Sequence, residues 1–316
     1  KDRQFDLIVG NPPFGTKVAD GDEDQLDGAS LDDYVLGRGK HSIQSEQIIL
    51  EKSVSWLKPG GRLGMVLPDG VLNNSGSQSN CPALREWLFK SGRILSVISL
   101  PDFAFRRSGA TNKTSILIFE KFSDLESARL NNRLEACEGD IAAALMDSGL
   151  DYNIFFGEAS HIGYTPSGRP DPRNDLYVAD ENGYLSNDQT GSILGEWNVW
   201  EENGAVSDPR CVVERASSVW RSHSSHRVDP KYHVYVAHKG DYVPQGWSSA
   251  PMMNLVKRMR RNVDFGEEPM KEYKVLTLSQ TGVARLREPG VGNNPPEWRG
   301  MYFYDSSSDW FEVRTS

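Results

Sequence analysis

The sequence predicts an α/β protein: the second half of a doubly wound sheet, followed by part of an α+β domain. Over the first 121 residues, short apolar runs rich in β-branched residues alternate with longer stretches of helical periodicity. Glycine or proline closes several of the apolar runs. Residues 180–225 are polar and dotted with glycine and serine, which indicates a boundary between two domains.

The first element is expected to be a buried strand. Residues Phe5–Val9 are apolar and too few for a helix, and Gly10 closes the run. Asn11, Pro12 and Pro13 follow, and the two prolines make this loop stiff because their φ is fixed and they lack an N–H group. Open α/β sheets bind ligands at the carboxyl ends of their strands, so this loop is a candidate binding loop.

The loop offers two hydrogen-bond acceptors and an aromatic ring. The Asn11 side-chain oxygen and the Pro12 carbonyl can hold both hydrogens of an amino group, and Phe14 can stack on the ring that carries it. The amino group of a nucleobase is a poor nucleophile, because its lone pair is delocalised. Two fixed acceptors stabilise the positive charge that develops as it attacks a methyl donor. Stacking on Phe14 offsets part of the cost of flipping the base out of the helix.

The motif Asn11-Pro12-Pro13-Phe14 after an apolar strand resembles the catalytic motif of amino-group methyltransferases that use S-adenosylmethionine. The resemblance is strongest to the N-6 adenine-specific DNA methylases of restriction–modification systems, of the type I modification subunit and type IIG kinds. It implies a site-specific DNA methyltransferase of the prokaryotic cytoplasm that acts on a flipped adenine in double-stranded DNA. It also implies specificity or restriction subunits as partners.

Two alternatives stay open. Glutamine methyltransferases of release factors and some guanine methyltransferases of ribosomal RNA resemble the motif too, so the substrate can be RNA or protein. The chain can also be a non-catalytic DNA-binding or assembly fragment. The motif's first three residues recur at 294–296 without a preceding strand or a following aromatic, and we interpret that copy as an ordinary loop.

The following elements complete the predicted half-sheet. A helix with Ser42 or Ser45 as its N-terminal cap is expected to end at residue 57, and a strand is expected at 63–68. A helix at 82–89, a strand at 94–100 and a final antiparallel strand at 114–121 come next. This order resembles the second half of a Rossmann-like methyltransferase sheet. Residues 16–40, rich in aspartate and glycine, are expected to form a solvated loop. In the family that the chain resembles this region often gates the base pocket, so a mobile flap is the alternative. The aspartates lack the spacing of a calcium loop, so we expect no metal.

The cofactor-binding residues cannot be assigned. In the family that the chain resembles, a glycine-rich loop and an acidic residue hold S-adenosylmethionine and precede the strand at Phe5–Val9. Neither Gly60-Gly61 nor Gly37-Arg38-Gly39 matches that pattern. We therefore expect this chain to be a piece of a longer protein, without its cofactor-binding half and inactive by itself.

The loop 101–113 carries the remaining site candidates. Relatives use an aromatic residue here to stack on the far face of the base, which favours Phe105, or else Phe103; core packing is the alternative. Arg106, Arg107 and Lys113 are candidates for contacts with DNA phosphates, or belong to a solvated loop.

Residues 1–205 are expected to form the catalytic part, with helix-like periodicity at 125–150, a strand at 153–157 and a hairpin at 161–170. Residues 206–316 are expected to begin a target-recognition-like domain. The opening of that domain, Arg227–Tyr232, resembles the start of such domains in type I specificity subunits. A basic cluster at 257–261 is a further candidate for phosphate contacts, or the exposed face of a helix.

Composition limits the class of protein. The chain has 316 residues and a formal net charge of −9, which neither proves nor excludes a nucleic-acid partner. No stretch of about 20 apolar residues is present, so no membrane span is expected. The 3 cysteines have neither disulfide-framework nor zinc spacing and are expected to be reduced thiols.

Overall fold

The computed structural model describes residues 5–21, 29–76, 79–108 and 112–238, together with four strands between 256 and 314. The chain forms two compact units, Lys1–Lys239 and Gly240–Ser316. The units divide later than the predicted boundary after residue 205. The reason is that the strand and helices of residues 211–237 pair with and pack on the sheet of the first unit.

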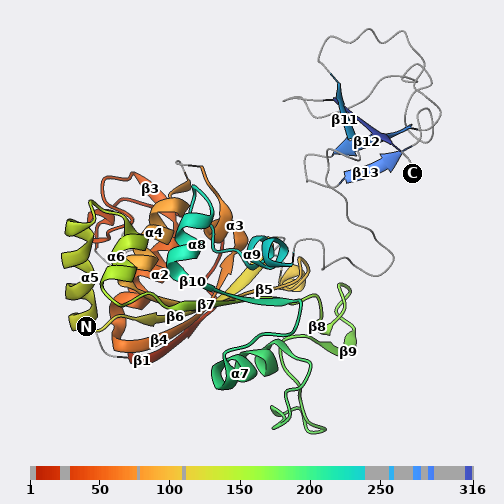
Figure 1. The fold of residues 1–316 in the computed structure, drawn as a ribbon, viewed down its shortest axis with the longest axis horizontal. Coiled ribbons are helices and arrows are strands. Elements are labelled where there is room, and N and C mark those ends of the chain that lie inside the picture. The colour runs from red at the N-terminus through yellow and green to blue at the C-terminus, as the bar shows by residue number, and fades with distance from the viewer. Residues whose placement is uncertain are drawn as a thin grey trace. The chain divides into compact units, whose positions relative to one another are not determined.

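A six-stranded mixed sheet organises the first unit, in the order β1-β4-β6-β5-β7-β10 (Figure 1). Its strands are β1 (Phe5–Gly10), β4 (Leu57–Pro68), β6 (Thr114–Lys121), β5 (Gly92–Ser99), β7 (Asn153–Glu158) and β10 (Cys211–Arg215). β1 is parallel to β4, and β5 is parallel to β7. β6 is antiparallel to both of its neighbours, β4 and β5, as predicted for the strand at 114–121, and β10 is antiparallel to β7. The predicted α/β fold class is therefore confirmed for the first unit.

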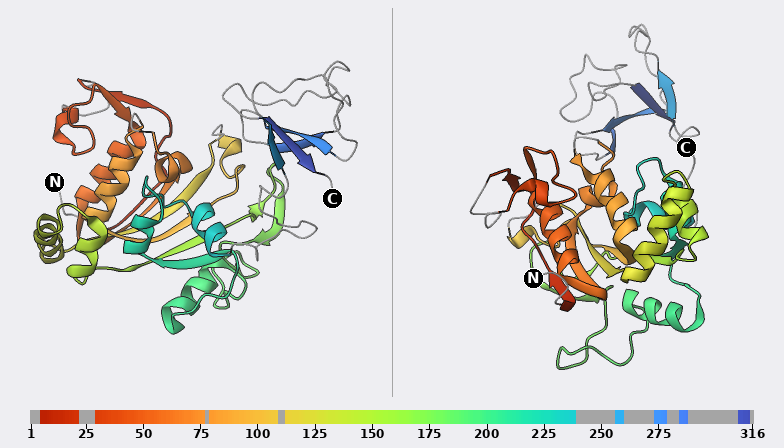
Figure 2. Two further views of the ribbon diagram at one scale, coloured as in Figure 1. Left: turned by 45° about the horizontal axis from the view of Figure 1, so that its top comes forward. Right: turned by 90° about the vertical axis from the view of Figure 1, so that its left-hand side faces the viewer.

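Most helices of the first unit share one apolar core with one face of the sheet (Figure 2). They are α2 (Ser45–Trp56), α3 (Asp69–Asn73), α4 (Cys81–Ser91), α5 (Asp124–Ala136), α6 (Ile141–Asp147), α8 (Ala216–Ser222) and α9 (Pro230–Ala237). The sheet supplies alternate residues to this core, such as Met65 of β4 and Leu117 of β6, because successive strand side chains point to opposite faces. The predicted helices at 42–57 and 82–89 correspond to α2 and α4.

One helix lies against the opposite face. Trp197 and Trp200 of α7 (Ile193–Asn203) contact the ring of Phe155 in β7, with ring centroids 5.3 and 6.0 Å apart. Phe155 and its neighbour Phe156 are both fully buried, but they belong to different cores because they point to different faces of the sheet. The local sequence pattern did not predict α7.

The prediction that Phe5–Val9 is a buried strand is wrong as to burial. The segment is a strand, but Leu7 and Val9 are 63% and 77% exposed. β1 is the edge strand of the sheet, and these side chains point away from the helical layer, toward which Ile8 packs. Strand propensity is a local property, whereas burial depends on what lies against each face.

Residues 29–40 are not the fully solvated loop that was predicted. Leu31 in the short helix η1 (Leu31–Asp33) and Leu36 are buried in the main core. The carboxylate of Glu51 in α2 accepts hydrogen bonds from the backbone N–H groups of Val35 (2.6 Å) and Leu36 (2.9 Å). These buried contacts fix the segment to α2, although its charged residues remain on the surface.

The predicted hairpin at 161–170 is present as β8 (Ile162–Tyr164) and β9 (Pro170–Asn174), and the predicted helical stretch at 125–150 forms the two helices α5 and α6. Arg227–Tyr232 enters α9 of the first unit. The second unit has one antiparallel sheet, in the order β11-β14-β12-β13. Its strands are β11 (Val256–Met259), β14 (Trp310–Arg314), β12 (Tyr273–Leu278) and β13 (Ala284–Arg287).

Two predicted features lie outside the described residues. They are Arg260 and Arg261 of the basic cluster at 257–261, and the second copy of the motif at 294–296. None of the helices that the structure describes has the length and apolar character needed to cross a membrane.

Candidate active site

The predicted loop leaves the carboxyl end of β1. Gly10, the last residue of β1, pairs with Met65 of β4, and the chain then turns through Asn11 to Phe14. Asn11 is exposed, Pro12 is buried and Phe14 is half-buried. The loop therefore presents the amide of Asn11 on the surface beside a partly covered aromatic ring, while Pro12 anchors it to the protein.

A small hairpin holds the other end of the loop. Residues Lys17–Ala19 form β2, which is antiparallel to β3 (Ser42–Gln44), with Lys17 opposite Gln44. β3 leads directly into α2 at Ser45. The loop is thus fixed to the main sheet on one side and to the start of a core helix on the other.

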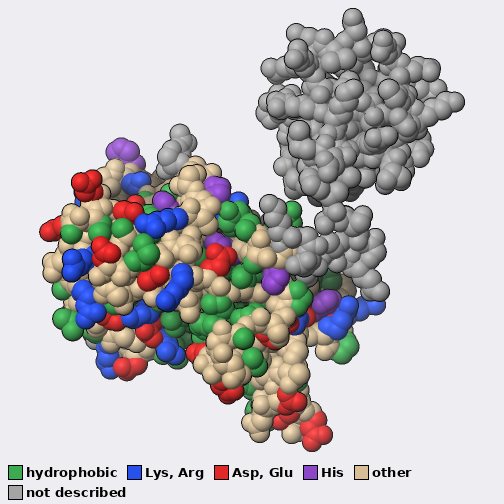
Figure 3. Space-filling view, viewed as in Figure 1, with side chains coloured by type: hydrophobic (Ala, Val, Ile, Leu, Met, Phe, Trp, Pro, Cys, Tyr) green, Lys and Arg blue, Asp and Glu red, His purple; other side chains and the backbone are tan. Residues whose placement is uncertain are grey.

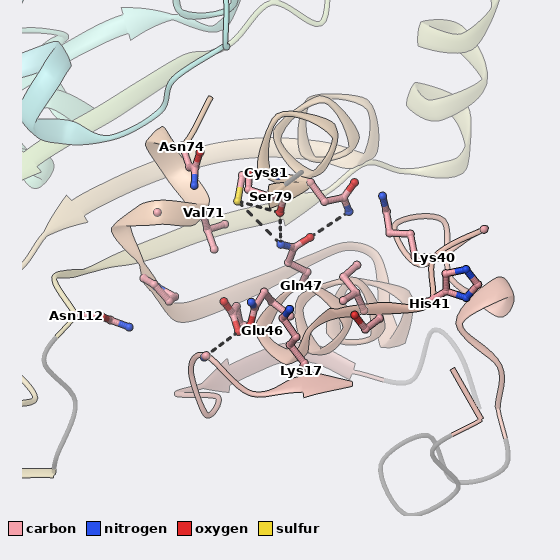
Figure 4. A pocket seen from close by; sticks show the side chains of 18 residues that line it. Lys17, Lys40, His41, Glu46, Gln47, Val71, Asn74, Ser79, Cys81 and Asn112 are labelled. Carbon is pink, nitrogen blue, oxygen red and sulfur yellow. Dashed lines mark hydrogen bonds between the residues drawn. The ribbon is translucent and has the colours of Figure 1, made fainter. Parts of the chain in front are cut away.

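The first two residues of α2 contact the loop directly. The Ser45 hydroxyl donates a hydrogen bond to the Pro13 carbonyl (3.2 Å), and the Ser45 N–H donates to the Thr16 carbonyl (2.8 Å). The Gly15 N–H donates to the Glu46 carboxylate at 3.4 Å (Figure 4). From the sequence, Ser45 is expected only as a helix cap and Glu46 has no predicted role, because local sequence carries no signal for partners 31 or 32 positions away.

A cavity of about 670 Å³ begins where the loop ends. Gly15 and Lys17 line one side of it, and Asn112 of the loop before β6 lines another. This volume lies in the range of ligand pockets. Polar side chains of its wall labelled in Figure 4 include Lys17, Lys40, His41, Glu46, Gln47, Asn74 and Ser79, with the thiol of Cys81. Ser42, Gln44 and Asn80 line the cavity as well. Asn11 and Phe14 are not among the lining residues.

Hydrogen bonds hold the deep wall of this cavity in place. The Gln47 amide nitrogen donates to the Ser79 carbonyl (2.9 Å), and the Gln47 oxygen accepts from the Asn80 side chain (3.1 Å). Burial raises the pKa of the Cys81 thiol, so Cys81 is neutral at physiological pH and is not an activated nucleophile. Its sulfur donates to the Ser79 carbonyl (3.5 Å) and accepts from the Gln47 amide nitrogen (4.0 Å).

One titratable group near the cavity has a clear structural partner. Asp69 lies between the lining residues Pro68 and Gly70, and its carboxylate accepts a 2.7 Å hydrogen bond from the Ser115 hydroxyl. Burial raises the pKa of Asp69, and the bond from Ser115 acts in the opposite direction. This bond links the end of β4 to the start of β6 at the edge of the sheet where the loop lies.

The loop after β5 meets the same edge of the sheet as the loop after β1. In the strand order, β4 and β6 separate β1 from β5, so the two loops start roughly 14 Å apart, about three strand spacings. Phe105 is half-buried, and Phe103 packs against Tyr164. The structure therefore places Phe14 and Phe105 at one edge of the sheet, but the strands from which they extend are not neighbours.

The predicted phosphate-binding residues follow in this loop. Arg106 is exposed and lies 3.8 Å from the carboxylate of Asp102. Arg107 is exposed and donates a long hydrogen bond (3.5 Å) to the Gly168 carbonyl of the β8–β9 turn. Lys113 is half-buried, and its carbonyl accepts from the Asp69 N–H (2.9 Å). On the face of the first unit drawn in Figure 3, basic and acidic side chains are interspersed.

The glycines considered for the cofactor have other places in the fold. Gly60 and Gly61 lie inside β4. Gly37 packs so closely on the Leu31 carbonyl that a Cβ atom there would lie 2.5 Å from its oxygen. Gly60 and Gly61 thus belong to a strand, and Gly37 serves close packing. No residue of this chain is assigned to bind S-adenosylmethionine.

Comparisons with known proteins agree with the motif. Residues 1–131 match the family model described as N-6 DNA Methylase. The chain is 28% identical over 120 residues to the methylase subunit of the type I restriction enzyme EcoEI from Escherichia coli, covering 38% of this chain and 22% of that protein. It is 24% identical over 228 residues to the methylase subunit of the type I restriction enzyme StySPI from Salmonella potsdam, covering 70% of this chain and 36% of that protein. The chain thus spans only a part of the length of these relatives.

Two solved structures of methyltransferase subunits are similar to this chain. One is the type I restriction–modification methyltransferase subunit from Streptococcus thermophilus, with 17% identity, a TM-score of 0.42, and coverage of 72% of this chain and 37% of that one. The other is a modification subunit of a putative type I restriction enzyme from Vibrio vulnificus, with 16% identity, a TM-score of 0.38 and the same coverage. The family match and the curated relatives confirm the predicted resemblance of this chain to the N-6 DNA methylases of type I restriction–modification systems.

Proposed function

We propose that this chain carries the amine-binding part of a DNA adenine methyltransferase of a restriction–modification system, which transfers a methyl group from S-adenosylmethionine to the 6-amino group of a flipped adenine. One observation carries the proposal. An exposed Asn11 stands on a loop stiffened by two prolines at the carboxyl end of a parallel strand, within the segment that matches the N-6 DNA methylases.

In this proposal each motif residue has a defined task. The Asn11 side-chain oxygen and the Pro12 carbonyl accept the two hydrogens of the adenine amino group. The nitrogen lone pair forms the new bond to the methyl carbon while the bond from that carbon to sulfur breaks, and one amino proton then leaves to water. Pro13 stiffens the loop and Phe14 stacks on the base. No strong base is needed, because the attacked methyl group is already activated.

The methyl donor that the family implies is S-adenosylmethionine, which supplies the electrophilic methyl group when bound. No group of this chain is assigned to bind it, and no metal is required by the reaction. Phe105 is proposed to cover the far face of the adenine. Arg106, Arg107 and Lys113 are proposed to contact phosphates of the double-stranded DNA, as positively charged groups near the edge of the sheet.

The second unit, Gly240–Ser316, is proposed to be part of a target-recognition-like domain. Its sheet carries Lys257 and Arg258 on β11, and its basic residues support a role near DNA. Specificity or restriction subunits are proposed as protein partners, since the curated relatives are subunits of type I restriction enzymes.

The test is methyl transfer by the natural polypeptide, with any subunits that copurify, from labelled methyl donor offered to DNA, RNA and protein. We expect label in the 6-amino group of DNA adenine. Asn11→Ala is expected to lower the rate by at least about a hundredfold, since it removes one of two fixed acceptors, with DNA binding retained.

Asn294→Ala, in the second copy of the motif, is the matched control and is expected to leave the rate unchanged. If label enters only RNA or only protein, that molecule is the substrate and the proposal of DNA as substrate is wrong. Full activity of Asn11→Ala would exclude the proposed mechanism.

A further inference from the structure

We infer that Ser45 and Glu46, the first two residues of α2, are positioning residues that hold the Asn11–Phe14 loop in its amine-binding shape. The inference rests on the proposed function, because it concerns the same loop. It assigns the start of α2 a role in the reaction although neither residue belongs to the motif.

The three hydrogen bonds from α2 reach three different positions on the exit side of the loop. Ser45 binds the Pro13 carbonyl with its hydroxyl and the Thr16 carbonyl with its N–H, at 3.2 and 2.8 Å. Glu46 accepts the Gly15 N–H at 3.4 Å. Two adjacent helix residues therefore fix the backbone from Pro13 to Thr16 from one side.

These bonds join buried residues of α2 to exposed residues of the loop, since Pro13, Gly15 and Thr16 are exposed. Ser45 is 5% exposed and Glu46 is 6% exposed. A buried acceptor or donor that loses its partner costs about 1–3 kcal/mol, whereas an exposed one is compensated by water. If the loop moved away, the buried Ser45 hydroxyl and Glu46 carboxylate would lose these partners, which favours the arrangement in which the bonds form.

The Ser45 bond determines the path of the chain into Phe14. The ring of Pro13 already fixes its φ, so ψ is the soft dihedral angle left at this residue. Holding the Pro13 carbonyl fixes that angle, and with it the direction in which the backbone enters Phe14. Pro12, just before it, is buried.

Helix capping does not account for the Ser45 hydroxyl. The residue before it, Gln44, is the N-cap of α2, and its side chain makes no capping bond. The Ser45 side chain points its hydrogen bond at the loop instead of the helix N-terminus. An acidic residue in the first turn stabilises any helix, so Glu46 could serve only the helix itself. The hydrogen bond from Gly15 to Glu46, in contrast, is specific to this fold.

The other end of α2 is anchored to the sheet. Lys121 of β6 donates from its ammonium group to the carbonyls of Val54 (2.8 Å), Ser55 (3.2 Å) and Leu57 (2.9 Å) at the carboxyl end of the helix. Val54 is also buried in the main core. The helix is thus a rigid support between the central strands and the loop.

The experiment compares Ser45→Ala and Glu46→Ala with the conservative variants Ser45→Thr and Glu46→Gln, in the natural polypeptide with DNA and methyl donor. Misplacement of reacting groups by about 1 Å lowers rates by as much as a hundredfold. We expect the alanine variants to lower kcat by about tenfold or more, with KM for DNA within about twofold. Thr and Gln keep the hydroxyl or an acceptor oxygen and are expected to restore most of kcat.

Hydrogen exchange of a peptide covering residues 10–17 gives a readout that is independent of activity. We expect faster exchange of this peptide in both alanine variants, and the largest change at the Gly15 amide in Glu46→Ala, which removes its acceptor. Glu51→Ala is the matched control, since Glu51 is in the same helix, is 8% exposed and also holds backbone N–H groups, those of Val35 and Leu36. It is expected to lower stability but to leave kcat and exchange at 10–17 unchanged.

The outcomes separate the two proposals. If the wild type transfers methyl groups and Asn11→Ala does not, but Ser45→Ala and Glu46→Ala keep kcat and exchange, the positioning role is excluded and the proposed function stands. If the wild type transfers nothing to DNA, the proposed function fails. In that case, unchanged hydrogen exchange at residues 10–17 in the alanine variants also excludes the support of the loop by Ser45 and Glu46. Faster exchange in these variants upholds that support. If Glu51→Ala lowers kcat as much as Glu46→Ala, general destabilisation explains both and the inference is overturned.

Discussion

The ring of Phe103 packs edge-to-face against the ring of Tyr164, with centroids 6.2 Å apart and an interplanar angle of 74°. The Tyr164 hydroxyl donates a 2.6 Å hydrogen bond to the carbonyl of Ala104, which holds the loop after β5 against β8. Among the described residues, no aromatic ring pair includes Phe105, and its side chain is half-buried. The structure thus gives the two neighbouring phenylalanines different surroundings.

This difference predicts different consequences of substitution. Phe105→Ala is expected to lower methyl transfer to DNA by about tenfold, because stacking on a base contributes roughly 1–3 kcal/mol, and to change stability little. Phe103→Ala is expected to lower the free energy of unfolding by about 1 kcal/mol or more, since it removes an aromatic pair. Single-turnover rates and urea unfolding of both variants distinguish these effects. A Phe105→Ala variant with wild-type rate would remove Phe105 from the site.

Arg85 is predicted to be essential for stability. It is fully buried, and its guanidinium donates to the carbonyls of Val71 (2.8 Å), Asn74 (2.9 Å) and Ser225 (3.1 and 2.6 Å). Burial lowers the pKa of Arg85 to about 10, so it remains charged at neutral pH. Arg85→Met leaves these carbonyls without their donor, and we expect a loss of at least about 3 kcal/mol in the free energy of unfolding.

Arg62→Met provides the comparison for Arg85. The Arg62 side chain is 63% exposed, and its bond to Glu120 (3.0 Å) is a surface ion pair. Such pairs contribute less than about 1 kcal/mol. Denaturant unfolding followed by tryptophan fluorescence measures both variants, and losses of equal size would contradict the role assigned to Arg85.

Glu126 is predicted to make the first unit sensitive to acid. Burial by itself raises the pKa of Glu126, but hydrogen bonds from Arg93 and from the backbone and hydroxyl of Ser123 outweigh it and lower the pKa from 4.5 to about 2. Because the pKa is lower in the folded state, the stabilisation is complete above about pH 4.5. It is lost as the pH falls from there toward 2, and amounts to at most about 3 kcal/mol.

Urea unfolding between pH 6 and about pH 2.5 tests this prediction. Glu126→Gln is expected to lower stability at pH 6 and to depend less on pH than the wild type. Glu86→Gln is the control, because the Glu86 side chain is 47% exposed and pairs with Lys90 on the surface. Parallel pH curves for Glu126→Gln and the wild type would exclude the assigned contribution.

Two glycines in the sheet are predicted to differ in their tolerance of alanine. A Cβ atom at Gly92 of β5 would lie 2.1 Å from the Glu120 carbonyl oxygen and 2.5 Å from the Phe119 ring. At Gly64 of β4 the nearest atom would be Ile118 Cδ1, at 3.6 Å. Gly92→Ala is therefore expected to cost at least about 2 kcal/mol, as overpacking does, and Gly64→Ala less than about 0.5 kcal/mol. Thermal unfolding compares them, and equal melting temperatures would contradict the prediction.

Local pattern was sufficient for most of the strands and helices before residue 158. The apolar runs at 63–68, 94–100, 114–121 and 153–157 are strands, and the stretches at 42–57 and 82–89 contain helices. In each of these segments, the spacing of apolar residues and the residues that end the strand or helix lie within the segment itself. α7, β10 and α8 were not predicted. Trp197 of α7, for example, is stabilised by Phe155, which lies far away in the sequence.

The sequence by itself determined the stiffness of the loop, since Pro12 and Pro13 restrict the backbone in any fold, and it determined that a strand precedes them. Only the tertiary structure decided that this strand is an exposed edge, that Ser45 and Glu46 reach the loop, and that a cavity begins at Gly15. Proline restraint and strand periodicity act between adjacent residues. The order of strands in a sheet and the partners of buried polar groups arise from contacts across the chain, which no local pattern encodes.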